Sequence, residues 1–187
     1  MQVEPESPPS AGAWDGPWPQ SRDEFAGLVD AYLDRLVRYA FRRLGNIEDA
    51  EDVVQEVLVR AFADRTKRRK TSAVGPYLYR SVANACTDLL RRRTGSAGGF
   101  REVGEEGPVD ESKNPSEVAL AAEELRRVER LLSRLPDAQA EVVRLRAFDE
   151  LRLREIADVV GCSVNTVCSR LRYGFRKLRD LVSREQG

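Results

Sequence analysis

The segment from Glu155 to Val167 contains the residue types that a helix-turn-helix motif needs. Ala157 is small at a position where two helices must cross closely, and Gly161 follows where a tight turn needs a permissive backbone. Ser163 is a favourable N-cap for a second helix, and Val167 can pack back toward the first. In this motif the second helix enters the major groove of DNA. The segment therefore predicts binding to duplex DNA.

The predicted second helix separates an apolar side from a polar and basic side. Between Ser163 and Arg179 it has five cations and no acid. The side expected to face DNA contains Asn165, Cys168, Ser169, Arg172 and Arg176. The apolar side is expected to contain Val164, Val167, Leu171, Phe175 and Leu178. An ordinary amphipathic hairpin with a basic outer surface is the alternative interpretation.

Charge is distributed unevenly along a chain whose net charge is zero. Residues 1–59, 60–94, 95–125 and 126–187 carry net charges of −7, +8, −6 and +5. Alternation on this scale predicts two separate anion-binding surfaces, each flanked by an acidic segment. Solvated charged faces would explain any single block, but they explain the alternation less well.

Apolar periodicity predicts helices throughout the chain and no strand, so the expected fold class is all-α. In the amino-terminal half, helices are expected from Ser21 to Leu44, from Ile47 to about Phe62 and from Pro76 to about Arg93. In the carboxy-terminal half they are expected over residues 116–135, 138–148, 153–160 and 164–182. Gly45 should end the first helix, and Asn46 should cap the second.

Two stretches without apolar periodicity divide the chain. Residues 1–21 are rich in proline and are expected to be a disordered tail, although Trp14 and Trp18 could dock on the folded body or on a partner. Residues 95–116 contain five glycines and a run of acids, which is typical of a flexible linker. The sequence therefore predicts two small helical domains, residues 22–94 and 117–187, joined by an acidic linker.

The composition favours a binding protein over an enzyme. Histidine, the commonest general base and metal ligand, is absent, and there is no nucleotide-binding loop, nucleophile elbow or zinc-protease motif. Cys86, Cys162 and Cys168 lack metal-type spacing and are expected to be reduced thiols. No apolar run is long enough to span a membrane, and no secretion signal follows Met1. We therefore expect a cytosolic protein without enzymatic activity, cofactor or metal.

Both halves of the chain resemble conserved regions of the sigma-70 family of RNA polymerase sigma factors, in particular the extracytoplasmic-function type. Residues 131–136, 141–145 and 155–179 are similar to the family's fourth conserved region, which also resembles the effector domains of two-component regulators. The amino-terminal half separates these families, because residues 44–57 and 77–93 resemble the second conserved region at the family's spacing. The resemblance implies a factor that directs RNA polymerase to promoters and helps to open them. The implied partners are core polymerase, promoter DNA and an anti-sigma factor.

The resemblance also implies roles for three sets of residues. The polymerase-binding set, which in the family docks on the clamp helices of the largest polymerase subunit, is Asp49, Asp52, Gln55 and Glu56. The minus-ten set, where the family recognises and melts DNA, is Lys67, Arg68, Arg69, Lys70, Tyr77, Arg80, Asn84, Asp88, Arg91 and Arg92. The minus-thirty-five set is Ser163, Asn165, Thr166, Cys168, Ser169, Arg172, Tyr173 and Arg176.

Residue chemistry supports these assignments, with two departures from the family. The acids of the polymerase-binding set would form one stripe on a helix, although a solvated acidic face would look the same. Tyr77 could supply the stacking wall and Asn84 the polar edge that a flipped base needs, although Tyr77 could equally be a core residue. The family usually has tryptophan where Tyr77 stands. It commonly has lysine or arginine where Cys168 stands, which puts a DNA contact at that position in doubt.

Two other functions fit parts of the pattern. A self-standing helix-turn-helix repressor or activator would use the same second helix without polymerase. A protein-interaction module would use its helix pairs to bind a signalling partner. Promoter-specific initiation by core polymerase in the presence of the chain would distinguish a sigma factor from both.

Overall fold

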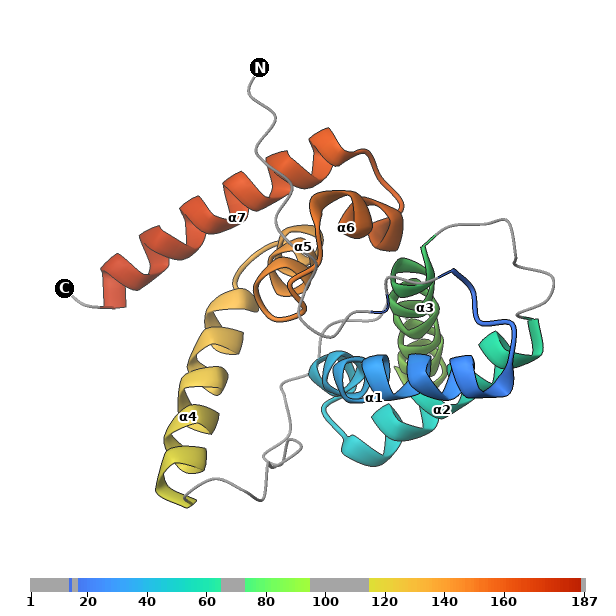
Figure 1. The fold of residues 1–187 in the computed structure, drawn as a ribbon. Coiled ribbons are helices and arrows are strands. Elements are labelled where there is room, and N and C mark those ends of the chain that lie inside the picture. The colour runs from blue at the N-terminus through green and yellow to red at the C-terminus, as the bar shows by residue number, and fades with distance from the viewer. Residues whose placement is uncertain (1–13, 15–16, 65–72, 95–114, 186–187) are drawn as a thin grey trace.

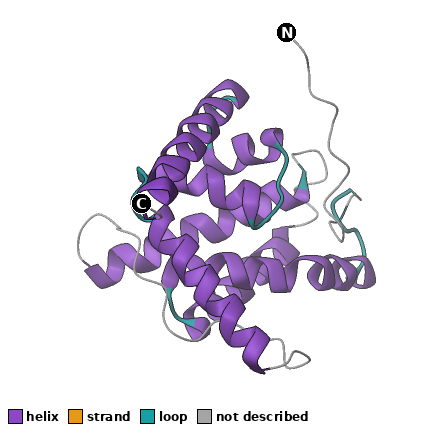
Figure 2. Ribbon diagram, turned by 90° about the vertical axis from the view of Figure 1, so that its left-hand side faces the viewer, coloured by secondary structure: helices purple, strands orange, loops and turns teal. Residues whose placement is uncertain are grey.

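Every regular element in the described part of the chain is an α-helix, which confirms the predicted all-α class (Figures 1 and 2). The computed structural model describes Trp14 and residues 17–64, 73–94 and 115–185. The helices are α1 (Arg22–Leu44), α2 (Ile47–Asp64), α3 (Val74–Thr94), α4 (Pro115–Leu132), α5 (Asp137–Ala147), α6 (Leu153–Val160) and α7 (Val164–Glu185). Each predicted helix end lies within three residues of the observed one.

Polar caps fix the ends of α1 and the start of α2. Ser21 and Glu24 form a capping box: the backbone N–H of Glu24 donates to Ser21 Oγ at 3.1 Å, and the backbone N–H of Ser21 donates to the Glu24 carboxylate at 3.4 Å. α1 ends at Gly45, and Asn46 Oδ1 then accepts a hydrogen bond from the backbone N–H of Asp49 at 2.8 Å. The sequence predicts that Gly45 ends α1 and that Asn46 caps α2. The short turn between the helices brings α2 back against α1.

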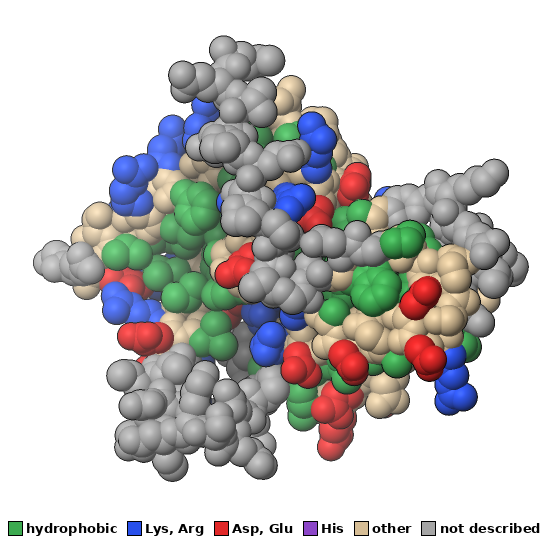
Figure 3. Space-filling view, in the orientation of Figure 1, with side chains coloured by type: hydrophobic (Ala, Val, Ile, Leu, Met, Phe, Trp, Pro, Cys, Tyr) green, Lys and Arg blue, Asp and Glu red, His purple; other side chains and the backbone are tan. Residues whose placement is uncertain are grey.

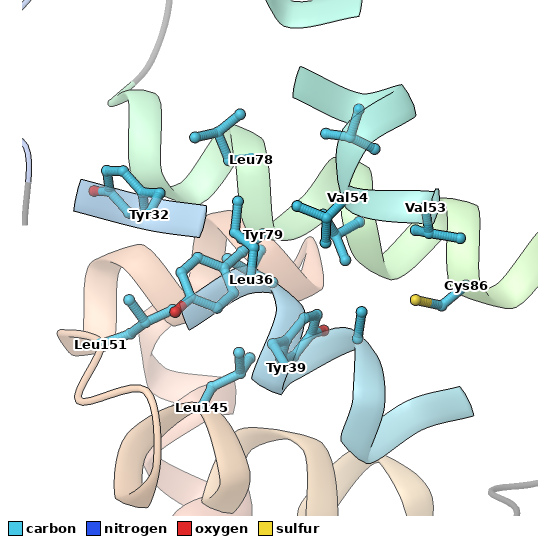
Figure 4. Packing of buried hydrophobic residues seen from close by; sticks show 14 of the residues in the cluster. Tyr32, Leu36, Tyr39, Val53, Val54, Leu78, Tyr79, Cys86, Leu145 and Leu151 are labelled. Atoms are coloured by element: carbon cyan, nitrogen blue, oxygen red, sulfur yellow. The ribbon is translucent and has the colours of Figure 1, made fainter. Parts of the chain in front are cut away.

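Helices α1, α2 and α3 pack on one another around large apolar side chains. Leu28 and Leu36 of α1, Val54 of α2, and Leu78 and Val82 of α3 are fully buried, and Figure 4 shows several of them converging. Burying a side chain of this kind contributes about 1.5–3 kcal/mol. These three helices therefore form one packed unit.

Helices α5, α6 and α7 form the second unit, and the carboxyl end of α4 joins it. Val142 of α5, Ile156 of α6 and Val167 of α7 are fully buried at its centre. Arg144 of α5 forms a buried ion pair with Glu129 of α4, with a distance of 2.7 Å between Nη2 and Oε2. From this core α4 and α7 extend in different directions (Figure 1).

Gly174 stands in the middle of α7, where glycine costs about 1 kcal/mol of helix stability relative to alanine. It is buried, and a Cβ built there would lie 2.9 Å from Cγ2 of Val143 and 3.4 Å from Cδ2 of Leu135. Glycine therefore lets α7 lie close against α5.

The two units lie directly against each other, which the sequence does not indicate. α3 packs on α6, and the buried residues of both units belong to one continuous cluster (Figure 1). Tyr39 and Tyr79 of the first unit are buried beside Leu145 and Leu151 of the second (Figure 4). The two tyrosine rings pack edge to face with centroids 5.2 Å apart. The expected linker, apart from its last two residues, lies outside the described residues.

The end of the predicted tail is part of the folded body rather than disordered. Trp18 is 4% exposed, and its ring packs edge-on against Tyr77 with centroids 5.1 Å apart. Trp14 Nε1 donates a hydrogen bond to the backbone oxygen of Pro17 at 3.0 Å. Of the two alternatives for Trp18, docking on the chain's own body is the one observed. Residues 1–13, 15 and 16 lie outside the described residues.

Candidate nucleic-acid interface

The turn between α6 and α7 has helix-turn-helix geometry. Gly161 ends α6 with a φ of 67°, in the left-handed region that favours glycine. The backbone N–H of Thr166 donates to Ser163 Oγ at 3.1 Å, so Ser163 caps α7 as the sequence predicts. Ile156 and Val167 are fully buried behind the turn. This packing fixes the angle at which α7 leaves the domain.

The first half of α7 presents its predicted DNA-binding residues to solvent. Seven of the eight residues in the minus-thirty-five set are exposed, and Thr166 is half-buried; the exposed residues are Ser163, Asn165, Cys168, Ser169, Arg172, Tyr173 and Arg176. The opposite, buried side runs through Leu171 and Gly174. Two residues of the expected apolar side, Val164 and Phe175, are 36% and 47% exposed, so this side of α7 is only partly buried. Next to Phe175, Gly174 lies against α5, where a Cβ built on it would be 2.9 Å from Cγ2 of Val143.

Two of these cations share one aromatic ring. The guanidinium carbons of Arg172 and Arg176 lie 5.2 and 5.0 Å from the centroid of the Tyr173 ring. Cation–π contacts of this length hold an arginine in place without neutralising it. Tyr173 therefore keeps two positive charges side by side on the exposed side of α7.

On α3, the predicted minus-ten residues follow one face. Arg80 and Asn84 are exposed, and Tyr77 is half-buried beside Trp18. The packing of Tyr77 fixes its ring while leaving part of the side chain accessible. The four basic residues assigned to this set before α3 lie outside the described residues; they are Lys67, Arg68, Arg69 and Lys70.

The carboxyl-terminal half of α3 continues the same face with charged side chains. Asp88, Arg91 and Arg92 are all exposed. Asp88 and Arg91 form a long ion pair of 3.9 Å, which contributes little at the surface because water screens it. This end of the helix therefore offers two cations to an anionic partner.

Beside the contact between α3 and α6 lies an open hollow of about 840 Å³, lined by α3 and by the helix-turn-helix. One wall contains α3 residues, among them Tyr77, Arg80 and Asn84, and the other contains residues 157–158 and 161–163. A Cβ built at Gly161 would lie 4.0 Å from a guanidinium nitrogen of Arg80. The structure therefore brings parts of the minus-ten set and Ser163 of the minus-thirty-five set to a single hollow.

α2 presents the predicted polymerase-binding set. Asp52, Gln55 and Glu56 are exposed, and Figure 3 shows acidic side chains gathered over α1 and α2 and basic ones along α7. Asp49 differs from the other three, because its side chain is 18% exposed and both its oxygens accept hydrogen bonds from Arg93 of α3, one of them at 2.6 Å. The structure thus leaves three of the four residues open to a partner.

Buried charges that the sequence analysis did not single out join the two units. Arg42 Nη2 of α1 lies 2.6 Å from Asp149 Oδ2 in the loop after α5, and these side chains are 9% and 3% exposed. Arg43 Nη1 lies 2.7 Å from Glu141 Oε2 of α5. Neither arginine could be found from periodicity, because both lie beside the apolar stripe of α1.

Hydrogen bonds extend this network on both sides of the contact. Tyr39 donates to Glu141 Oε1 at 2.6 Å, and Tyr79 donates to Asp149 Oδ1 at 3.2 Å. Arg35 donates to the backbone oxygen of Asp149 at 2.5 Å. Glu141 and Asp149 therefore each have at least two partners on the first unit.

Burial governs protonation in this network. It raises the pKa of Asp149 even though Arg42 acts in the opposite direction, so the loss of hydration outweighs the gain from pairing. Burial, reinforced by Glu141, raises the pKa of Tyr39, and burial, reinforced by Asp149, raises the pKa of Tyr79. Both tyrosines are therefore neutral hydrogen-bond donors at physiological pH.

The cysteines and acids do not form a metal site within the described residues. No group of three or more His, Cys, Asp or Glu side chains there could hold a metal ion. The three thiols are free, and burial raises the pKa of Cys86 to about 12. Among the described helices, none is both long and apolar enough to cross a membrane.

Comparison with known families divides the chain as the structure does. Residues 28–95 match Sigma-70 region 2, and residues 131–180 match Sigma-70 region 4. The first match covers nearly all of α1 to α3, and the second covers α5, α6 and most of α7.

Individual relatives and solved structures agree with this division. SigW of Bacillus subtilis, an ECF RNA polymerase sigma factor, is 30% identical over 165 residues, which cover 84% of this chain and 88% of that protein. CnrH, solved in complex with the cytosolic domain of CnrY, has a TM-score of 0.64 at 24% identity and covers 88% of this chain and 90% of its own. The sigma factor RpoE, solved with the anti-sigma factor NepR from Bartonella quintana, has a TM-score of 0.65 at 22% identity. The match covers 86% of this chain and 98% of RpoE. The two structures show the same fold. The chain is therefore a member of the sigma-70 family, an RNA polymerase sigma factor of the extracytoplasmic-function type that directs the polymerase to promoters.

Proposed function

We propose that the factor divides promoter recognition among three helices. The acidic surface of α2 binds core polymerase, the exposed face of α3 takes the opened minus-ten strand, and the first half of α7 binds the minus-thirty-five duplex. One observation supports this division: in the described residues the three sets lie on three separate helices, and most of their side chains are exposed.

The polymerase contact uses Asp52, Gln55 and Glu56. These side chains are exposed on the side of α2 opposite its buried residues, where they can meet a basic surface. Glu56 already forms an exposed ion pair with Arg60, which contributes little because water screens it. Asp49 stabilises the position of α2 through Arg93 and contributes less to binding. Charge complementarity of this kind mainly sets the association rate and the orientation of the partner.

Strand opening uses the face of α3. Tyr77 offers a ring for stacking, Asn84 offers hydrogen-bonding groups to a base edge, and Arg80 offers a cation to a flanking phosphate. The basic segment Lys67–Lys70, which precedes α3 in the sequence, would add phosphate contacts. Because Trp18 packs against Tyr77, the stacking ring has a fixed position before DNA arrives.

Duplex recognition uses the exposed side of α7. Arg172 is assigned to a base edge and Arg176 to a phosphate, with Tyr173 holding both side chains. Cys168 is not a cationic residue, so phosphate contacts on this side of α7 rely on its arginine neighbours.

The remaining assignments complete the proposal. Residues 22–94 and 117–187 are the two functional domains, and residues 95–116 link them. The factor acts in the cytoplasm with core polymerase and promoter DNA and has no catalytic activity of its own. An anti-sigma factor restrains it, which is supported by the partners named for the two structural neighbours.

Charge reversal on α2 tests the polymerase contact. Asp52→Lys/Glu56→Lys should lower the affinity for core polymerase by about 30-fold or more, as loss of paired interface charges does. Asp30→Lys/Asp34→Lys is the matched control, because it changes two exposed acids one turn apart on α1 by the same charge. Affinity would be measured by fluorescence anisotropy of the labelled factor, with helical content checked by circular dichroism. Equal affinity for both variants would refute the α2 assignment.

A further inference from the structure

The segment that precedes α1 is held against the start of that helix by its own hydrogen bonds. Trp14 Nε1 donates to the backbone oxygen of Pro17 at 3.0 Å, and Gln20 Nε2 donates to the backbone oxygen of Trp18 at 2.6 Å. The backbone N–H of Gln20 donates to the Glu24 carboxylate at 2.6 Å, which ties the segment to the capping box of α1. These bonds fix the path of the chain as it approaches α1.

This path places the Trp18 side chain inside the first unit, behind Tyr77. Trp18 is 4% exposed, and its ring meets the Tyr77 ring with centroids 5.1 Å apart and an angle of 68° between the planes. Edge-to-face pairs of this kind stabilise one relative orientation of the two rings. Because Trp18 is buried, any effect that it has on DNA must pass through Tyr77.

Tyr77 lies between this packed interior and the surface assigned to the minus-ten strand. It is half-buried, and it lines the open hollow together with Arg80 and Asn84. Ordering a side chain when a partner binds costs free energy, and a side chain that is already held in place avoids this cost. Contact with Trp18 therefore prepares the Tyr77 ring for stacking before a base arrives.

Trp18 lies outside the part of the chain that matches the family. The match to Sigma-70 region 2 begins at residue 28, within α1. The support for Tyr77 therefore comes in part from a segment that precedes the matched region.

We propose that Trp18 is a positioning residue for strand opening, which holds the Tyr77 ring ready to stack on a flipped base of the minus-ten element. The proposal rests on the role of Tyr77 in the proposed function. It makes residues 17–21 a working part of the DNA-binding surface, although Trp18 itself does not touch DNA.

Trp18→Leu tests the proposal in the full chain bound to core polymerase. Leucine keeps an apolar side chain at the buried position and removes the ring. Opening of a duplex promoter, followed by permanganate reactivity of unpaired thymines, should slow by about threefold to tenfold, the range that an edge-to-face pair supplies. A template with a pre-melted bubble should restore transcription. Trp18→Phe retains an aromatic edge and should lose less.

A second buried aromatic pair in the same unit supplies the matched control. Phe25 and Phe62 also pack edge to face, with centroids 5.0 Å apart and an angle of 68° between the planes, and Phe25 is 8% exposed. Phe25→Leu therefore makes a similar change in the core at a different ring, and it should leave promoter opening unchanged. If Trp18→Leu loses helical content in circular dichroism, Trp18→Met replaces it, because a flexible thioether fills irregular space without a ring.

Combination with Tyr77→Ala distinguishes positioning from general support of the fold. If Trp18 acts through Tyr77, Trp18→Leu should add little to the opening defect of Tyr77→Ala, because the ring that it holds is already absent. Two independent structural losses would instead multiply their effects on the opening rate.

Normal opening by folded Trp18→Leu or Trp18→Met, together with a defect in Tyr77→Ala, would overturn this proposal and leave the proposed function intact. Multiplied defects in the double variant, or an equal defect in Phe25→Leu, would also overturn it. Normal opening by Tyr77→Ala would overturn both this proposal and the role of Tyr77 in strand opening.

Discussion

Arg42 and Asp149 form a buried ion pair at 2.6 Å although 107 positions separate them in the sequence. The pair connects α1 of the region-2 unit to the loop before the helix-turn-helix of the region-4 unit. Because burial raises the pKa of Asp149 despite this partner, the pair orients the two units at a cost in hydration. This relationship makes the contact between the domains dependent on protonation.

Docking of the two units on each other should become more favourable as the pH falls. Asp149 is faced by Arg35 and Arg42 of α1, Tyr79 of α3 and Glu141 of α5, and burial raises its pKa above that in an open form, in which the units are apart. The docked, closed form therefore binds a proton more readily, and this contribution is lost as the pH rises through the closed-form pKa. Each unit of pKa difference is worth about 1.4 kcal/mol.

X-ray scattering of the free factor, from neutral pH down to the ordinary carboxyl range near pH 4, measures this dependence. The Asp149→Asn variant should show a flatter response than wild type, because it lacks the titrating group. A wild-type factor that opens on acidification more than Asp149→Asn does would contradict the assigned direction.

Gly174→Ala should destabilise the protein although alanine is the better helix former. Alanine gains about 1 kcal/mol of helix propensity, but its Cβ would meet the branched Val143 side chain at 2.9 Å, and overpacking of this kind costs about 1–3 kcal/mol. Urea unfolding should therefore show a net loss of about 1 kcal/mol. Ser183→Ala, at an exposed position on the same helix, should not lose stability. A clear gain for Gly174→Ala would refute the close contact between α7 and α5.

The cations on α7 should have separable effects on the upstream element. Arg172→Ala should reduce the discrimination between upstream sequences by about 1–3 kcal/mol. Arg176→Ala should weaken binding to all upstream sequences equally and should lower the slope of log affinity against log salt by about one. Tyr173→Ala should impair both functions, and Tyr173→Phe should preserve them, because the ring positions both guanidinium groups. Transcription from upstream-element variants measures these effects. Arg184→Ala, near the far end of α7, is the control. Wild-type selectivity and strength in both arginine variants would exclude this helix as the recognition element.

Tyr77→Ala/Asn84→Ala should impair strand opening much more than polymerase binding. Loss of base stacking costs about 1–3 kcal/mol per base, and a template with a pre-melted bubble removes the opening step. The bubble should therefore restore most of the lost transcription. Tyr77→Phe/Asn84→Ala retains the ring that packs on Trp18 and should lose less activity. Failure of the bubble to rescue either variant would mean that α3 does not open DNA.

The helices could be predicted from the sequence because local signals determine them. Ser21, Gly45, Asn46, Gly161 and Ser163 each act through their own backbone or through a residue a few positions away. Apolar periodicity then identifies the buried side of most helices. It does not predict the exposure of Phe175 beside Gly174, whose close approach to α5 a hydrophobicity pattern does not record.

The contact between the domains could not be predicted, because it depends on residues that are distant in the sequence. Arg42, Glu141 and Asp149 look like ordinary surface charges, and their burial follows only from how two folded units meet. The same applies to Trp18, whose place against Tyr77 depends on the path of the chain before α1. Family resemblance predicts which residues bind DNA, but it does not predict that part of both sets lines a single hollow.

Transcription start mapping with purified core polymerase tests the central claim most directly. A library of random promoter fragments would be transcribed by core polymerase with and without the chain, and the 5′ ends of the transcripts would be sequenced. We predict that the chain produces defined starts preceded by two shared sequence elements at a constant spacing, and that Asp52→Lys/Glu56→Lys abolishes them. Starts that are the same with and without the chain would contradict its role as a sigma factor.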